Sequence, residues 1–582
     1  MIHVKDHKTV TMFDPWWYLG PKRKKLLELS WPGLFREFIL NELPVQKIAT
    51  YFKDDFGRPT KELYCASGVL VLQQMQDLSD EETVAQLAFN TQWHYALDIT
   101  DEADDAKYMS YKTLWNFRKK VIDLGLEEEI FAAGTDKLLK AFNVDTDKQR
   151  IDSVHIRSNM KRLGRINIFS RSIRGFLINL KRHYREVFEA LPDRYKDRYL
   201  TDKAMGCFSM VKPSEAERTL KELSADLYGL VEWYKDNEKI CAMTTYKLLK
   251  RVLREQCVVK EGECDCPVEV SVKPSKEVPS DSLQNPSDPE ATYDGHKGQG
   301  YQVQVMETYN RKEETGAVEV LNLITYVSVE PAHESDANAM MPAVEAVAER
   351  GFDPKELLAD SLYGSDANTE AAKLKGIEVV SPAMGHTNSN GLSLTDFEKT
   401  ETGEISSCPA GHTPLETKIK GDRRIVVFDL KQCGCCGRLE SCPVKQGKRH
   451  YFFRYDEKQV RLAERRAYEN TEEFKDIYRY RAGVESTMSS YDRLTGVKRL
   501  RVRGLKAVRF CATLKALSVN IFRAAAFRAR NLREKEAIEE IVSTIDGCCY
   551  ASCKAMKKLY RHLIHAADKY TANNAFVLHR AA

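Results

Sequence analysis

The sequence predicts an α/β protein whose core is a mixed β-sheet flanked by helices. Three observations lead to this prediction. Strand-like segments rich in Ile and Val recur at 148–159, 300–308, 321–333, 356–360 and 377–383, and segments with helical periodicity separate the later ones. Residues 20–142 show only helical patterns joined by short links, and a helical pattern returns between 160 and 257. The core is therefore expected to carry an all-helical N-terminal domain and a helical insertion.

The composition is that of a soluble globular protein with several domains. The chain has 582 residues, of which 43% are hydrophobic and 30% charged, and its formal net charge is only +4. The first twenty residues contain no apolar run of signal-peptide length, and no later segment approaches the roughly 18 uninterrupted apolar residues of a membrane helix. We therefore expect a cytoplasmic protein without a membrane partner. Fifteen cysteines in a reducing compartment indicate metal ligation or burial more often than disulfides.

Changes in composition divide the chain into seven parts. They are a helical N-terminal domain (1–145), the first strand of the core (146–160), a helical insertion with a linker (161–285), the continued core (286–384), a cysteine-rich insertion (385–462), a helix with a basic C-terminal part of the core (463–527), and a helical tail (528–582). Ser79 with Glu82 and Ser110 each mark a helix start in the first part. The basic helix after Ser110 suits a DNA backbone or plain scaffolding equally well.

Two aspartates occur in predicted strands, where a buried carboxylate needs an ion partner or a metal. Asp152 lies inside the strand KQRIDSVHIRSN, and Asp360 ends the strand in ELLADSLYGS. A solvent-facing position at a strand end is the alternative for Asp152. Polar groups at the carboxyl ends of strands in an open sheet are where ligands bind.

A third carboxylate lies on a predicted helix in the stretch from Thr471 to Thr495. Tyr478, Arg481 and Glu485 are spaced so that they share one helical face. A basic tract without acidic residues follows, which suits a polyanion backbone. Its cations are Arg493, Lys498, Arg499, Arg501, Arg503, Lys506 and Arg509.

Three carboxylates from two strands and a later helix would form an oxygen-rich site suited to Mg²⁺ or Mn²⁺. Two such ions about 3.5 to 4 Å apart activate an attacking oxygen and stabilise a leaving oxygen in displacement at phosphorus. The predicted chemistry is therefore cleavage and transfer of phosphodiesters, with nucleic acid as the substrate.

These motifs resemble those of DDE transposases of bacterial insertion sequences, specifically the insertion-sequence eleven-eighty-two group with its InsH-like N-terminal domain. The resemblance covers residues 20 to about 525. IDSVHIRSN matches the family's first aspartate motif at Asp152, and LADSLYGS matches the second at Asp360. The family's Tyr-x2-Arg-x3-Glu pattern matches Tyr478, Arg481 and Glu485. Related families end this pattern with a lysine where this chain has Asp492, and Arg493 is the neighbouring cation.

The resemblance implies an RNase H-like core and a two-step reaction, in which water cleaves DNA at the element's end and the freed 3′-hydroxyl attacks target DNA. It implies that Asp152, Asp360 and Glu485 hold two magnesium (or manganese) ions and that Tyr478 and Arg481 position DNA. Double-stranded DNA is the implied partner, a homodimer on DNA the implied assembly, and the bacterial or archaeal cytosol, next to the nucleoid, the implied location.

The cysteine-rich insertion has its own predicted site. Cys408, Cys433, Cys436 and Cys442 suit a tetrahedral zinc site, in which His412 or Cys435 could replace one ligand, and free thiols are the alternative. Cys257, Cys264 and Cys266 lack a second ligand pair and are expected to be unligated. His155 and His333 lie near the predicted active-site strands and are more often structural than catalytic at such positions.

Two other functions are compatible with these residues. A structure-specific nuclease of the same fold would hydrolyse DNA without strand transfer. A transposase-derived DNA-binding protein would do no chemistry, but such a protein gains nothing from negative charge concentrated beside phosphate.

Overall fold

The computed structural model describes residues 2–9, 12–53, 59–201, 208, 210–260, 268–311, 320–385, 391–547 and 560–565. The chain forms two compact units. The first comprises residues 1–69, 82–109 and 520–582, and the second comprises residues 70–81 and 110–519. The cysteines Cys264 and Cys266, which were expected to be unligated, lie outside the described residues.

The first unit is helical at its N-terminal end, as predicted. Trp16, Leu19, Leu27 and Tyr95 form a small buried cluster in it. Its helices are α1 (Pro21–Glu28), α2 (Trp31–Leu34), η1 (Phe35–Ile39), η2 (Leu40–Glu42), α3 (Val45–Ala49), the start of α4 (Leu63–Met75), α5 (Asp80–Phe89) from Glu82 onward, α6 (Thr91–Ala96) and α7 (Asp104–Lys107).

A histidine between two carboxylates ties the N-terminal segment to these helices. His7 Nδ1 lies 2.9 Å from Asp98 Oδ2, and His7 Nε2 lies 3.5 Å from Glu62 Oε2. Burial disfavours the charged imidazolium, but the bonds to Asp98 and Glu62 outweigh it, so the pKa of His7 is raised. The ion pair is therefore strongest when His7 is protonated.

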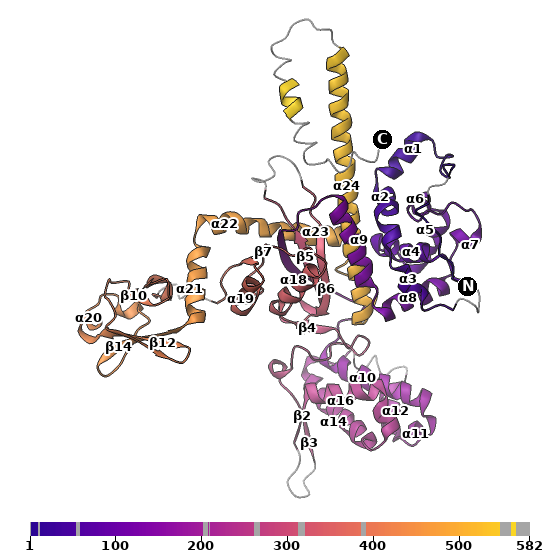
Figure 1. Ribbon diagram of the computed structural model, residues 1–582. Helices are drawn as coiled ribbons and strands as arrows, with labels where there is room; N and C mark the ends of the chain where they lie inside the picture. Colours follow the sequence, from indigo (N-terminus) through magenta and orange to yellow (C-terminus); the bar gives the residue numbers. More distant parts are fainter. Residues whose placement is uncertain are drawn as a thin grey trace. The chain divides into compact units, whose positions relative to one another are not determined.

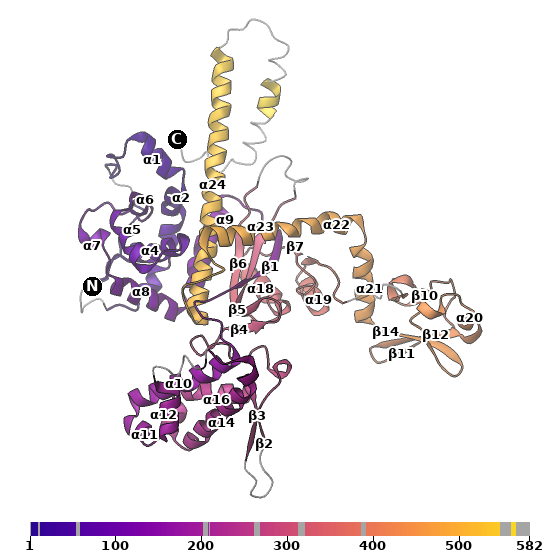
Figure 2. The ribbon, with the colours of Figure 1, turned by 180° about the vertical axis from the view of Figure 1, so that it is seen from behind.

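A mixed sheet forms the centre of the second unit. Its strands are β1 (Lys148–Ile156), β4 (Thr292–Asp294), β5 (Gly298–Thr308), β6 (Ile324–Pro331), β7 (Glu356–Leu358) and β8 (Glu378–Val380). The order is β5-β1-β7-β8, and both β4 and β6 pair with β5. The pairings of β5 with β1, β4 and β6 are antiparallel, whereas β1, β7 and β8 run parallel. Figure 1 shows β5, β6 and β7 of this sheet, and Figure 2 shows them from behind together with β1.

Helices cover the sheet, as the predicted fold class requires. Residues of α18 (Met340–Ala348) and α19 (Asp366–Leu374) pack with Ile151 and Leu357 in one buried cluster. Leu358 and Val380 instead join Phe474 and partly buried tyrosines from α22 (Glu472–Tyr478) and η8 (Arg479–Ala482). Because neighbouring strand residues point to opposite faces, Leu357 and Leu358 place these clusters on opposite sides of the sheet.

Other helices of the second unit also begin where the sequence predicts. Ser110 accepts a hydrogen bond from Thr113 N (3.3 Å) and caps α8 (Tyr111–Leu124), and α9 (Glu127–Ala141) follows. The helical insertion has its own core and contains α10 (Arg165–His183), α11 (Arg185–Glu189), α12 (Asp193–Leu200), η3 (Pro213–Glu215), α14 (Ala216–Tyr234), α15 (Glu238–Ala242), α16 (Thr244–Gln256), β2 (Cys257–Lys260), β3 (Glu269–Val272) and η4 (Ser275–Glu277).

The cysteine-rich insertion is a small β-lobe with a separate buried cluster. Four antiparallel strands pair in the order β11-β12-β14-β13, and β9 pairs with β10. The elements of the lobe are η6 (Leu394–Asp396), β9 (Glu398–Lys399), β10 (Ile405–Ser407), β11 (Glu416–Lys420), β12 (Arg423–Asp429), α20 (Leu430–Gly434), η7 (Leu439–Ser441), β13 (Lys445–Gln446) and β14 (His450–Asp456). The helix α21 (Glu457–Glu469) follows them. The short turn η5 (Asp336–Asn338) belongs to the core and lies between β6 and α18.

The helix expected to carry Tyr478, Arg481 and Glu485 on one face is interrupted, so that part of the prediction is wrong. Tyr478 ends α22, Arg481 lies in the 3₁₀ turn η8, and Glu485 lies in the first turn of α23 (Gly483–Thr495). A Cβ on Gly483 would lie 2.1 Å from Arg150 Nη1. The buried Arg150 side chain thus packs directly against the backbone at Gly483, where α23 begins, and a larger residue at this position would clash with it.

The last long helix, α24 (Leu505–Gly547), continues through the predicted boundary at 527/528. Its segment Leu505–Glu539 is long and apolar enough to cross a membrane, but 78% of its most apolar window is buried inside the protein. A buried core helix of a soluble protein passes the same test, so this helix is weak support for a membrane span.

Candidate active site

Asp152 lies on β1, and Asp360 follows the end of β7, the parallel neighbour of β1. Arg150 on β1 pairs with Leu358, the last residue of β7, and Asp152 and Asp360 each lie two residues further along the chain. β7 ends two residues before the predicted end. Asp360 Oδ1 accepts hydrogen bonds from Leu362 N (2.8 Å) and Tyr363 N (3.3 Å), so its carboxylate caps the turn that replaces the strand.

Arg481 links Asp152 to Glu485. Its Nη2 donates to Asp152 Oδ2 at 2.9 Å, and its Nη1 lies 3.9 Å from Glu485 Oε1. The Asp152 side chain is 17% exposed, whereas that of Glu485 is 73% exposed. One guanidinium therefore ties a mostly buried carboxylate to an exposed one.

The electrostatics around Asp152 are those of crowded carboxylates. Burial raises the pKa of Asp152, and the charges of Asp360 and Asp336 raise it further, while Arg481 and the Ser153 N–H act in the opposite direction. Burial also raises the pKa of Tyr478, and the same two carboxylates, Asp152 and Asp360, add to that effect. These mutual effects place Asp152, Asp360, Arg481 and Tyr478 in one neighbourhood.

A fourth carboxylate, Asp336, joins this neighbourhood, and the sequence reasoning missed it. Its oxygens accept hydrogen bonds from Ser153 Oγ (3.3 Å) and Gln304 Nε2 (2.9 Å), and its exposed fraction is 9%. The hydroxyl of Tyr363, three residues after Asp360, donates a hydrogen bond to Gln304 Oε1. Asp336 lies in the turn η5, five residues after β6, and its carboxylate shortly after a predicted strand is the signal that could have found it.

A buried ion pair holds the turn that carries Arg481. Arg150 and Glu307 lie opposite each other on β1 and β5, and Arg150 Nε donates to Glu307 Oε1 at 2.8 Å. Arg150 Nη1 also donates to Tyr480 O (2.6 Å), and Thr487 Oγ1 donates to Glu307 Oε2 (2.6 Å). The pair therefore connects the sheet to both η8 and α23.

The basic tract after α23 runs beside the continuation of β1. Arg157 N donates to Lys498 O (3.0 Å), Leu500 N donates to Arg157 O (2.8 Å), and Asn159 N donates to Val502 O (2.8 Å). Asp492, which stands where related families carry lysine, accepts a hydrogen bond from Lys498 N (3.1 Å) and so shapes the turn into this tract. The exposed side chains predicted to bind DNA are Arg493, Lys498, Arg499, Arg501 and Arg503.

A cavity of about 610 Å³ lies next to this tract within the second unit. Arg501 and Arg503 line it together with Trp115, Arg118 and Lys119 of α8. Trp115 is 51% exposed, and Lys119 Nζ lies 5.4 Å from the centre of its ring. Cations beside an exposed aromatic ring are suited to both phosphates and bases.

Two family matches complete the description of this site. Residues 407–525 match the family described as Transposase DDE domain, and residues 33–120 match the family described as Transposase domain (DUF772). Both matches are to domains of DDE-type insertion-sequence transposases. They support a DNA transposase, an enzyme that cleaves and transfers phosphodiesters. The DDE match includes Glu485 and the basic tract, and neither match includes Asp152 or Asp360.

Other comparisons add little to the description of this transposase. No curated protein matches the chain. A solved structure described as a piggyBac transposase synaptic complex with hairpin DNA matches with 10% identity over 97% of this chain and 81% of that chain, at a TM-score of 0.28. A likeness of this size supports no statement about the fold or function of the transposase.

The remaining predicted site residues of the transposase have local partners. His155 Nε2 lies 3.2 Å from Gln299 O, and His333 Nδ1 lies 3.0 Å from Thr292 Oγ1. Cys257 is buried, and burial raises the pKa of its thiol to about 11.

In the described ranges, no group of three or more His, Cys, Asp or Glu side chains is arranged to hold a metal ion. The metal sites therefore remain predictions.

Proposed function

We propose that this transposase cleaves DNA at the ends of its element and joins the freed ends to target DNA, with Asp152, Asp360 and Glu485 as the catalytic carboxylates. The observation that best supports this proposal is the register of β1 and β7, in which Arg150 pairs with Leu358, and Asp152 and Asp360 each follow two residues later. Arg481 forms an ion pair with Asp152 and lies 3.9 Å from Glu485. Residues that are far apart in the sequence would thus contribute the carboxylates of one site.

The donor set fits divalent metal ions. Oxygen ligands suit Mg²⁺ and Mn²⁺. Burial raises the pKa of Asp152, the charges of Asp360 and Asp336 raise it further, and a bound cation would stabilise the charged carboxylate against both effects. Asp152 and Asp360 would hold the ions, and Glu485 would complete the site once its exposed side chain turns inward. When bound, two divalent ions supply charge stabilisation to the attacking and the leaving oxygen.

Arg481 has two roles in this proposal. In the absence of cations it balances the charge of Asp152 and Glu485. Among the described residues, none forms a hydrogen bond with its buried Nε, and an unpaired buried donor favours movement of the side chain toward a new acceptor. Once the carboxylates bind cations, the guanidinium would turn to a DNA phosphate, for which its planar donors are suited. Tyr478, half-buried against Phe474 at a ring distance of 5.2 Å, would pack beside the same nucleotide.

The core is proposed to be of the RNase H-like class. Support comes from β1 at the junction of an antiparallel half, β5 with β6, and a parallel half, β7 with β8. Asp360 lies two residues beyond the end of β7, and Asp152 lies two residues beyond the part of β1 that pairs with β7; ligands bind beyond the carboxyl ends of parallel strands in open sheets.

The exposed cations after α23 are proposed to guide DNA to the carboxylates. Arg499 and Arg501 follow the continuation of β1 beyond Asp152, so a backbone bound there would enter from the strand end that carries the site. The cavity lined by Trp115 would accept a base or a phosphate of the same DNA. We expect the active assembly to be a homodimer that holds two DNA ends, and we expect transposition to take place in the cytoplasm.

Separate assays of cleavage and strand transfer test the proposal. Asp360→Asn removes one charge with little change in volume, and it should abolish both reactions on end-containing DNA with Mg²⁺ while DNA binding persists. The matched control is Asp353→Asn, an exposed aspartate before β7, which should retain both reactions. Full activity of Asp360→Asn would refute the site. Cleavage without strand transfer by the unmodified protein would favour the nuclease, and DNA binding without either reaction would favour the binding protein.

A further inference from the structure

The cysteine-rich lobe is small for an independently stable domain. Its strands enclose one buried cluster that includes Phe397, Val426, Phe428 and Phe453. Domains shorter than about 70 residues rarely gain enough stability from such a core and are commonly cross-linked by disulfides or a metal. All its cysteines are free thiols in the described part of the chain. A metal is therefore the cross-link to look for.

The cysteines of the lobe lie in, or next to, its short turns. Cys408 follows β10 in a tight turn, where Gly411 N donates to Cys408 O (2.7 Å) and His412 N donates to Cys408 Sγ (3.4 Å). Cys433 lies in α20, and Cys436 N donates to Cys433 O (3.1 Å). Cys442 follows η7. A backbone N–H aimed at a cysteine sulfur stabilises the thiolate form that binds metals.

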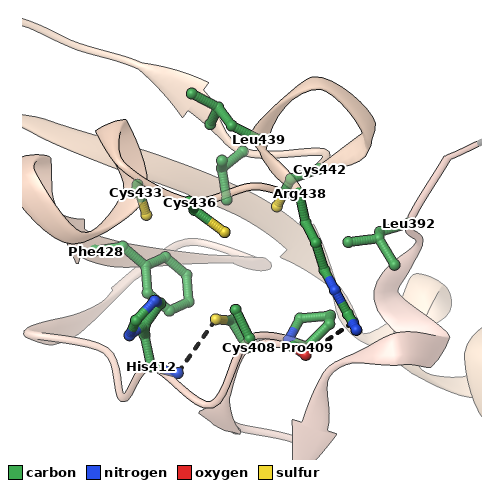
Figure 3. A pocket seen from close by; sticks show the side chains of 12 residues that line it. Leu392, Cys408, Pro409, His412, Phe428, Cys433, Cys436, Arg438, Leu439 and Cys442 are labelled. Atoms are coloured by element: carbon green, nitrogen blue, oxygen red, sulfur yellow. Dashed lines mark hydrogen bonds between the residues drawn. The ribbon is translucent and has the colours of Figure 1, made fainter.

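The four sulfurs line one cavity of about 20 Å³. Figure 3 shows Cys433, Cys436 and Cys442 pointing from one side into the space that Cys408 and His412 border on the other. The size suits one water molecule or one ion. Cys435 is exposed and does not line this cavity, whereas its neighbour Cys436 does.

We infer that Cys408, Cys433, Cys436 and Cys442 bind one structural Zn²⁺ ion. Four thiolates at the corners of a small cavity are the donor set that zinc prefers, with Zn–S distances of about 2.3 Å. Among the described residues, these side chains are not arranged to hold a metal ion. The four cysteine side chains must therefore move closer together when zinc binds. Such a closed shell leaves no position for substrate, and this site is independent of the proposed carboxylate chemistry.

The zinc site would hold a lobe that lies, along the chain, between Asp360 and Glu485. α21 leads from the lobe back to the core, where Arg461 binds Asp366 (2.7 Å) and Arg465 Nη1 donates to Gly364 O (2.7 Å). Both contacts fall just after Asp360. Loss of zinc should therefore unfold the lobe and leave α21 attached at its core contacts.

Metal analysis of the untagged full-length protein tests this inference. Protein prepared with Zn²⁺ should contain about one zinc per chain. Cys436→Ser should lose most of it, and the matched control Cys435→Ser should keep it. Substitution by Co²⁺ should give the absorption of a tetrahedral four-thiolate site, unchanged in His412→Gln. Zinc loss in His412→Gln would overturn the four-thiolate assignment in favour of an imidazole ligand.

A second measurement keeps the test decisive if Cys436→Ser does not fold. Unmodified protein is treated with a zinc chelator, and hydrogen exchange of residues 391–456 is compared before treatment, after it, and after Zn²⁺ is restored. Exchange should rise in the lobe, stay unchanged in the helical insertion, and return on addition of Zn²⁺. Native protein without zinc, whose four cysteines react with a thiol reagent while the lobe stays protected, would overturn the inference.

Discussion

Removal of Glu307 should loosen the turn that carries Arg481 and Glu485. The Glu307 carboxylate is fully buried and accepts hydrogen bonds from Arg150 Nε (2.8 Å) and Thr487 Oγ1 (2.6 Å). Glu307→Ala leaves the guanidinium of Arg150, whose side chain is 9% exposed, without its counter-charge. Breaking a buried pair from one side costs about 3–5 kcal/mol, which multiplies local opening of α23 between about a hundredfold and a few thousandfold.

Hydrogen exchange of the α23 amides measures this opening directly. Glu378→Ala, an exposed carboxylate on β8, is the control and should leave exchange in α23 unchanged. The double variant Arg150→Met/Glu307→Leu should open less than Glu307→Ala, because it leaves no unpaired buried charge. Unchanged exchange in Glu307→Ala, or additive effects of Arg150→Met and Glu307→Leu, would refute the reasoning.

Three further predictions concern single side chains. Since the pKa of His7 is raised above 6.5, its stabilising charge is present below that value and lost as pH rises through the folded pKa; protection of the N-terminal helices should therefore fall as pH rises above 6.5, and His7→Gln should abolish the trend. Gly483→Ala should lower the melting temperature and cleavage together, because its Cβ meets Arg150; unchanged values would contradict the packing argument. Arg501→Ala should reduce the slope of log affinity for DNA against log salt by about 0.9, whereas Arg185→Ala, on the exposed face of α11, should not change it.

The sequence could predict what depends on neighbours along the chain. Helical periodicity and the cap at Ser110 predicted α8, and the Ile- and Val-rich run around Asp152 predicted β1. Asp152 and Asp360 were singled out because a buried carboxylate in a strand needs a partner, and the Tyr-x2-Arg-x3-Glu pattern singled out Glu485. The four lobe cysteines were likewise visible from their spacing.

Contacts between distant segments were decided only by the tertiary structure. No local pattern reveals that Arg150 faces Glu307 across two strands, since a cross-strand pair depends on the register. That pair, with Gly483, breaks the helix expected through Tyr478 and Glu485 into a turn. Asp336 enters the site through Ser153 and Gln304, which belong to other strands. Sequence determined the chemical groups and the local elements, and folding decided which groups share a charge environment, because electrostatic and packing energies depend on distance in space.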